Sequence, residues 1–146
     1  MRSPPRGLIE ETTRIGARLL RAGHDFRVSP QIDGWRWECG DDSLILPEPE
    51  LAAPSQIDNA AAAIMALHSL RERIGWDEHA IAQGVRAARV PARLQRLQKT
   101  GAPELVIDVG HNPQAARELA RWLAEHPPRG RNTAVFGALA DKDVAG

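Results

Sequence analysis

Hydrophobic and polar positions repeat with a helical period in three parts of the chain. The clearest case is residues 57–74, where one stripe contains Ile57, Ala60, Ile64, Leu67, Leu70 and Ile74. Apolar side chains three or four residues apart share one helix face, so this spacing predicts an amphipathic helix, which Asp58 or Asn59 could cap. Weaker stripes predict helices over residues 8–22 and from about residue 77 to residue 87.

Between the first two of these helices the pattern changes to that of short strands. Extended segments are predicted at residues 24–29, 34–40 and 43–46. Pro30 to Gly34 would form the first turn. Side chains alternate along a strand, so Trp35 and Trp37 share one face, and we interpret them as core residues rather than as a binding cage.

The last third of the chain is predicted to be a strand–helix–strand unit. The strands lie at residues 104–109 and 132–139, and the helix lies at residues 113–125. Such a unit pairs its strands in parallel through a right-handed crossover, which makes the expected fold class α/β. Two parallel strands and one helix cannot close a core, because parallel sheets are covered on both faces. We therefore expect the chain to be an incomplete, internal fragment of a longer protein.

Composition and charge narrow the class of protein. The chain has 146 residues, of which 42% are apolar, and its 19 basic and 19 acidic residues cancel. Zero net charge gives no reason to expect nucleic acid or an anionic membrane as a partner. No window reaches the roughly 18 apolar residues of a membrane span. Cys39 is the single cysteine, so an internal disulfide is impossible, and this favours a cytoplasmic location for the protein.

The sequence DVGHNP, residues 108–113, combines a strand end with a helix start. Ligands in open α/β sheets gather beyond the carboxyl ends of strands, where Asp108 is expected. Asn112 can cap the following helix, and Pro113 suits its first position. The helix N-terminus would attract an anion, whereas Asp108 suits a ribose hydroxyl, an ammonium group or a metal. The alternative is that Asp108 and Asn112 only cap and tie the turn.

Other residues have both a structural and a functional interpretation. Asn59 is first of all interpreted as a helix cap. Arg93 lies in a predicted connector, where it either forms a surface ion pair or binds a phosphate group. His111 could line a ligand site beside Asp108, whereas His68 follows no pattern and is expected at the surface. No second histidine or acid lies at zinc-ligand spacing, and no phosphate loop, dinucleotide fingerprint or nucleophile elbow is present.

These residues together resemble a known family. The stretch VPARLQRLQKTGAPELVIDVGHNPQAARELARWL is similar to the domain junction of the dihydrofolate synthase/folylpolyglutamate synthases, in the Mur ligase superfamily. The family pattern is a P-G-R-[FL]-Q connector, a strand and D-[VA]-[AG]-H-N-P. AVFGALADKDVAG resembles the family's next strand and D-K-D segment, and IDNAAAAIMALHSL resembles its N-A-A-x-A-x-x-A-L helix.

The resemblance implies a domain organisation and a reaction. Residues 1–88 would form the end of a central ATPase domain, and residues 104–146 would form the start of a Rossmann-like C-terminal domain. Residues 89–103 would be the connector between these two domains. The activity implied is an ATP-dependent ligase of folate biosynthesis and one-carbon metabolism. ATP, with Mg²⁺, would phosphorylate a carboxylate of dihydropteroate or a folate, and L-glutamate would attack the acyl phosphate. The full-length enzyme would be a cytoplasmic monomer without nucleic-acid or membrane partners.

The resemblance also implies the residues of a nucleotide site. Asn59, Arg93 and Asp108 match the family's ATP-contacting positions, and His111 lies close enough in sequence to line the same pocket. ATP would then be clamped between two domains whose closure aligns donor and acceptor.

Two departures from the family pattern limit what this chain can do. Ala92 replaces the glycine of P-G-R, which would cost about 1–2 kcal/mol if that position needs a left-handed backbone. Gly110 replaces the usual alanine. The family's phosphate loop, magnesium ligands and pteroate-binding residues lie upstream of the matched region. We therefore expect no catalytic residue, no metal ligand and no ligase activity in these residues alone.

Two alternatives to the folate-ligase function remain open. The chain could be a fragment of another Mur-type amino-acid ligase, or it could be a non-catalytic truncated remnant.

Overall fold

The computed structural model describes residues 4–50, 55–110, 112–128 and 130–139, and it divides into two units. The first unit comprises Met1–Glu48 and Asp58–Arg86, and the second comprises Pro49–Ile57 and Ala87–Gly146. Within the described ranges, no helix is both long and apolar enough to cross a membrane.

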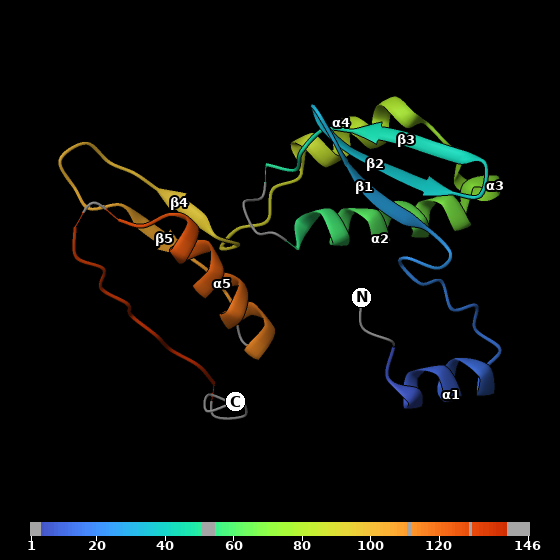
Figure 1. Ribbon diagram of the computed structural model, residues 1–146, viewed down its shortest axis with the longest axis horizontal. Helices are drawn as coiled ribbons and strands as arrows, with labels where there is room; N and C mark the ends of the chain where they lie inside the picture. The colour runs from blue at the N-terminus through green and yellow to red at the C-terminus, as the bar shows by residue number, and fades with distance from the viewer. Residues whose placement is uncertain (1–3, 51–54, 111, 129, 140–146) are drawn as a thin grey trace. The chain divides into compact units, whose positions relative to one another are not determined.

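The first unit is built on a three-stranded antiparallel sheet. Strands β1 (Arg27–Gln31), β2 (Gly34–Cys39) and β3 (Asp42–Leu46) follow one another in the order β1-β2-β3 (Figure 1). β1 continues through Pro30 to Gln31, so the turn starts after Gln31 and the prediction that it starts at Pro30 is wrong. An edge strand tolerates proline because it has one side without ladder hydrogen bonds, and β1 is such an edge.

The two tryptophans of β2 anchor the core of this unit, as their spacing predicts. Trp35 is 1% exposed and pairs across the ladder with Leu46, and Trp37 is 0% exposed and pairs with Leu44. These cross-strand pairs form one apolar face. The indole Nε1 of Trp35 donates a hydrogen bond to the carbonyl of Pro47 at 2.9 Å. Helix α2 runs along the sheet (Figure 1) and supplies the buried residues Ala61, Ile64 and Met65.

The helices of the first unit differ in detail from the expected ones. They are α1 (Arg6–Arg14), α2 (Gln56–Ser69), α3 (Arg71–Ile74) and α4 (Glu78–Ala87). The expected helix at 57–74 is interrupted at Leu70, where the Ser69 hydroxyl bonds back to the Ala66 carbonyl at 2.8 Å and competes with regular helix. Leu67, Leu70 and Ile74 of the expected apolar stripe are 41–57% exposed.

The helix starts are a mixture of confirmed and wrong predictions. Asp77 caps α4, since its Oδ1 accepts the backbone N–H of Ala80 at 3.0 Å. α2 already begins at Gln56, so Asp58 and Asn59 lie within its first turn and do not cap it. α1 ends at Arg14, well before the expected residue 22, and Gly16 just beyond it has a left-handed φ of 67°.

His68 is an unexpected member of an aromatic cluster with Trp37 and Trp76. Its side chain is 10% exposed, and its ring centroid lies 5.3 Å from those of both Trp37 and Trp76. The ring nitrogen Nε2 lies 2.8 Å from Oδ2 of Asp42, which also accepts a hydrogen bond from Arg71 at 3.0 Å. The expectation of a surface histidine is therefore wrong, because an aromatic ring pairs well with the indoles while its polar edge meets a carboxylate.

The described residues of the second unit form one small sheet and one long helix. Strand β4 (Gln95–Leu97) pairs antiparallel with β5 (Leu105–Ile107), and α5 (Pro113–Glu125) follows. Trp122 of α5 is buried, with the Arg96 guanidinium carbon 6.0 Å from its ring centroid. Leu94 is buried at the start of the hairpin.

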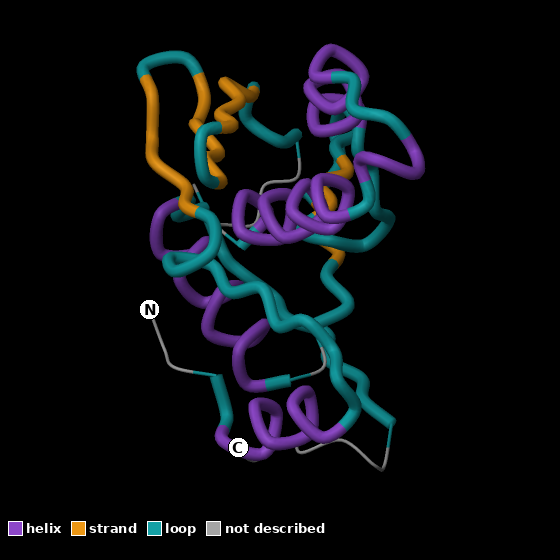
Figure 2. Tube along the Cα trace, turned by 90° about the vertical axis from the view of Figure 1, so that its right-hand side faces the viewer, coloured by secondary structure: helices purple, strands orange, loops and turns teal. Residues whose placement is uncertain are grey.

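The expected parallel strand–helix–strand unit is only partly present. Residues 130–139 form no strand and are drawn as loop in Figure 2, and Val135 there is 97% exposed. β5 pairs instead with β4, because the seven residues from 98 to 104 are enough for an antiparallel hairpin and too few for a crossover. A parallel pair needs cover on both faces, and the described residues of this unit contribute one helix.

The carboxylate of Asp42 gives the first unit a testable pH dependence. Its hydrogen bond with His68, followed by the charge of Arg71, lowers the pKa of Asp42 below its ordinary value of 3.8. A carboxyl whose pKa is lower in the folded state stabilises that state fully above the unfolded pKa and loses the contribution as pH falls through the folded pKa. The stability advantage over Asp42→Asn is therefore expected to shrink in that acidic window. Urea unfolding followed by tryptophan fluorescence measures it.

The matched control for this test is Asp41→Asn, which removes an exposed carboxyl from the same hairpin turn. Its stability relative to the wild type is expected to depend less on pH. An advantage over Asp42→Asn that stays constant through the acidic window would contradict the assignment.

Candidate functional site

The residues expected to contact a nucleotide are distributed over both units. Arg93 and Asp108 belong to the second unit, where the segment 92–94 runs beside the end of β5. Asn59 belongs to the first unit and is exposed on the first turn of α2. His111 lies outside the described residues. The structure thus brings Arg93 and Asp108 into one neighbourhood within a single unit.

Asp108 follows β5 directly, at the carboxyl end of the strand as expected. Its Oδ2 accepts the backbone N–H of Leu94 at 2.9 Å, and its Oδ1 accepts the N–H of Gly110 at 2.7 Å. These bonds bear out the structural interpretation that Asp108 ties its turn. They leave room for a ligand, because an ionised carboxylate has about four acceptor positions.

Gly110 completes the turn around this carboxylate. A Cβ atom at this position would lie 2.7 Å from Oδ1 of Asp108 and 3.0 Å from Cβ of Ala115. An alanine, the usual residue of the family, would therefore push against a carboxylate that two backbone groups already hold. The glycine allows the loop to close tightly between β5 and α5.

The connector before β4 has an unusual backbone. Ala92 and Leu94, on either side of Arg93, have left-handed φ angles of 56° and 47°. The left-handed geometry considered for Ala92 is therefore present, at a cost of about 1–2 kcal/mol per residue. Hydrogen bonds hold this backbone: the N–H of Ala92 donates to Gln95 Oε1 at 3.0 Å, and its carbonyl accepts the N–H of Val109 at 2.8 Å.

The N-terminus of α5 lies next to Asp108 in sequence and is capped as predicted. Asn112 has extended backbone angles, and its Oδ1 accepts the N–H of Ala115 at 2.9 Å. Pro113 occupies the first turn, where its missing N–H costs nothing. The cap satisfies one of the first N–H groups and leaves others of this turn to attract an anion.

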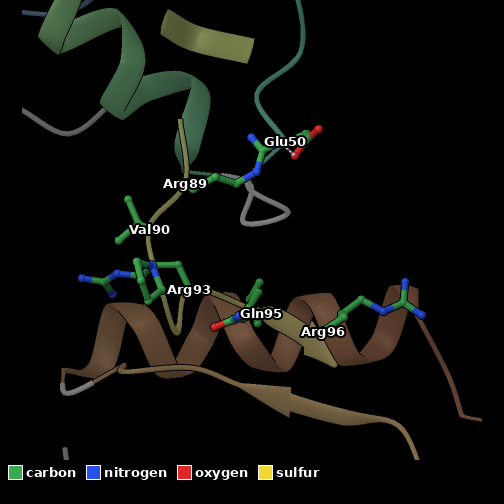
Figure 3. Close-up of a pocket in the computed structure, with 8 residues that line it drawn as sticks. Glu50, Arg89, Val90, Arg93, Gln95 and Arg96 are labelled. Atoms are coloured by element: carbon green, nitrogen blue, oxygen red, sulfur yellow. Dashed lines mark ion pairs between the residues drawn. The ribbon is translucent and has the colours of Figure 1, made fainter. Parts of the chain in front are cut away.

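An open hollow of about 480 Å³ lies along the connector, and three arginines line it. Arg89 forms an ion pair with Glu50, and Arg96 forms one with Glu104, whose hydrogen bond raises the pKa of Arg96. Figure 3 shows that Arg89 reaches toward Glu50 while Arg93 extends away from Arg96. Within the described part of the chain, no hydrogen bond or ion pair occupies the half-buried Arg93 guanidinium.

Gln95 is the residue of this site that sequence reasoning did not assign. It is the last residue of the P-A-R-L-Q segment and the first residue of β4. Its side chain reaches back three residues to the left-handed Ala92. Its place in the family's P-G-R-[FL]-Q pattern was a signal for it, but its hydrogen bond depends on a backbone conformation that the pattern does not specify.

Replacing Ala92 with glycine tests the strain in the connector. The change removes about 1–2 kcal/mol of left-handed strain and adds about 0.5–1 kcal/mol of unfolded-chain entropy, so we expect a net gain of roughly 0.5–1 kcal/mol. Amide hydrogen exchange in the β4–β5 hairpin should slow accordingly. Ala102→Gly, at a position without a positive φ, serves as the control and should not stabilise. Equal destabilisation by both changes would contradict a strained Ala92.

Comparison with known proteins shows which proteins this chain is similar to. Residues 92–146, which contain the connector, Asp108 and α5, match the family described as "Mur ligase, glutamate ligase domain". The dihydrofolate synthase/folylpolyglutamate synthase of Escherichia coli is 34% identical over 143 residues, which are 97% of this chain and 32% of that enzyme.

Solved structures give the same result for the fold. Escherichia coli FolC in complex with ADP is 30% identical, with a TM-score of 0.72 over 88% of this chain and 30% of that one. The Yersinia pestis bifunctional folylpolyglutamate synthase/dihydrofolate synthase, complexed with AMPPNP and a Mn ion, is 35% identical, with a TM-score of 0.69 over 84% of this chain and 28% of that one.

The chain thus spans about a third of the length of the Escherichia coli enzyme that it resembles. The similarity runs through both units, and the match to the glutamate ligase domain starts at Ala92, the first left-handed residue of the connector. Residues 92–146 thus match the Mur ligase glutamate ligase domain, and the chain is similar over most of its length to the dihydrofolate synthase/folylpolyglutamate synthases.

Proposed function

We propose that this chain is part of an ATP-dependent ligase that joins L-glutamate to dihydropteroate or a folate. On this proposal residues 1–88 are the end of the central ATPase domain and residues 104–146 are the start of the C-terminal domain. Residues 89–103 are the connector between the two domains. The observation that carries the proposal is the similarity to a folate ligase over 97% of the chain. It is supported by the bond from Asp108 to Leu94, the residue next to Arg93, at the start of the matching ligase domain.

The reaction has two steps. A carboxylate oxygen of the pteroate or folate attacks the γ-phosphorus of ATP, so that the bond to the β,γ-bridging oxygen breaks and ADP leaves. The amino group of L-glutamate then attacks the acyl carbon of the resulting acyl phosphate. A C–N bond forms, inorganic phosphate leaves with the C–O bond electrons, and the nitrogen loses its proton to give the amide.

Arg93 is proposed to hold phosphate oxygens of ATP. A guanidinium has five N–H donors in a planar fork, which suits phosphate recognition, and it stays charged at all working pH values. The guanidinium of Arg93 is half-buried on a strained connector, and it has no protein partner within the described ranges. A strained backbone that presents an unpaired cation is a typical arrangement at a ligand site.

Asp108 is proposed to bind the ribose of ATP, whereas Arg93 is proposed to bind its phosphates. Its carboxylate is already fixed by two backbone N–H groups, and its remaining acceptor positions suit the ribose hydroxyls of ATP. Asn59 and His111 are proposed as further nucleotide contacts on the basis of the family resemblance. None of these residues is proposed to take part in covalent chemistry.

Mg²⁺ is proposed as the ion that accompanies ATP, because it bridges phosphate oxygens and neutralises their charge in phosphoryl transfer. The described residues contain no group of three or more His, Cys, Asp or Glu that could hold a metal ion. On the basis of the family resemblance, the ligands of the ion are proposed to come from upstream parts of the ligase. We also propose, on the basis of the family resemblance, that the ligase acts as a cytoplasmic monomer.

The main alternative is another Mur-type amino-acid ligase. The match at residues 92–146 does not separate the two, because it is to a glutamate ligase domain described for Mur ligases in general. The folate assignment is supported by the first 91 residues, since the similarity to the folate enzyme continues through them.

Replacing Arg93 with alanine in the full-length ligase tests the proposed site. Loss of a charge-assisted hydrogen bond to phosphate removes about 1.5–3 kcal/mol, so the KM for ATP should rise about 10- to 100-fold. ADP release at varied ATP concentration measures the change. Arg121→Ala, an exposed arginine on α5, is the matched control and should leave the KM within about twofold. An unchanged KM in Arg93→Ala would contradict the phosphate role.

The 146-residue chain by itself is expected to bind nucleotide weakly without ligase activity. Asp108→Ala should abolish that binding, which isothermal titration with ADP can measure. Detectable ATP-dependent amide formation by the purified chain would contradict the expectation that γ-phosphate and metal are positioned by residues elsewhere in the ligase.

A further inference from the structure

The connector around Arg93 is held in a conformation that its own residues disfavour. Ala92 and Leu94 both carry a Cβ atom and both adopt left-handed φ angles, of 56° and 47°. A side chain between two such residues leaves the backbone in a direction that an extended or helical connector would not give it. The direction of the Arg93 side chain therefore depends on whatever keeps these two φ angles in place.

Two side chains provide this restraint from opposite ends. Asp108 accepts the N–H of Leu94 at 2.9 Å, and Gln95 accepts the N–H of Ala92 at 3.0 Å. The orientation of the Gln95 amide is fixed by this contact, because a backbone N–H requires the oxygen and not the nitrogen of the amide. Figure 3 shows Gln95 and Arg93 on the same short stretch before and at the start of β4.

The bond from Gln95 is poorly explained as a contribution to stability. Gln95 is exposed and its bond to Ala92 lies at the surface. Without the glutamine side chain, water could satisfy the Ala92 N–H at almost no cost to the folded state. The bond can matter more for geometry, since it closes the four-residue segment 92–95 with Arg93 inside it.

We propose that Gln95 is a positioning residue for Arg93: its side-chain amide oxygen fixes the left-handed backbone at Ala92, and this aims the Arg93 guanidinium at the phosphates of ATP. The inference rests on the proposed function, because it requires Arg93 to contact ATP. Asp108 holds the other end of the same segment, but it is itself a proposed nucleotide contact, so Gln95 is the residue on which positioning can be tested separately.

The test is a double-mutant cycle in the full-length ligase. Gln95→Met keeps the length of the side chain and removes the acceptor. Losing one neutral hydrogen bond that preorganises Arg93 should raise the KM for ATP about 2- to 10-fold. The KM for L-glutamate and the urea unfolding midpoint should stay unchanged. Gln98→Met makes the same chemical change at an exposed residue outside β4 and should leave the KM for ATP unchanged.

The cycle is completed by Arg93→Ala and by the Arg93→Ala/Gln95→Met double variant. If Gln95 acts through Arg93, then adding Gln95→Met to Arg93→Ala should cause no further rise in the KM for ATP. Additive effects of the two changes, or no effect of Gln95→Met while Arg93→Ala has one, would overturn the positioning role alone. If Arg93→Ala leaves the KM unchanged, the proposed phosphate contact fails, and the inference is overturned with it.

Discussion

The Asp108 carboxylate ties together the three parts of the second unit that matter for a ligand. One oxygen holds the connector through the N–H of Leu94, and the other closes the turn after β5 through the N–H of Gly110. The turn leads directly into the capped start of α5, and the connector carries Arg93. Removing this carboxylate would leave two backbone donors without their partner and release the connector from the strand end, so the geometry of the whole edge depends on it.

Different interactions stabilise the two units. The first unit has a core of large side chains, in which Trp35 and Trp37 are almost fully buried and the ring of Trp37 lies 5.3 Å from that of His68 in α2. The second unit depends less on burial and more on directed hydrogen bonds around the connector, Asp108 and Asn112. A region held by few apolar contacts opens easily, which is common for parts of proteins that bind ligands. The strain at Ala92 and Leu94 is located in this less strongly packed region.

Local patterns predicted much of this structure, while features that depend on distant partners were missed. Asp77 and Asn112 are caps, and Trp35 and Trp37 share a buried face, because each depends on neighbours in sequence or on strand alternation. The expected strand at 132–139 was wrong for the described residues, since pairing requires a covered sheet and not only an apolar run. β4 was missed because three residues are too few to show a two-residue period. The candidate site was found through the family resemblance, but neither the ring contacts of His68 nor the hydrogen bond of Gln95 to Ala92 has a signal in local periodicity.

The most direct test of the account is to measure ADP release by the full-length ligase with ATP, L-glutamate and each candidate acceptor in turn. The account predicts ADP release that requires L-glutamate together with dihydropteroate or a folate, and the matching amide as product. Release that requires a peptidoglycan precursor instead, or no release with any acceptor, would contradict the proposal that this chain belongs to a folate ligase.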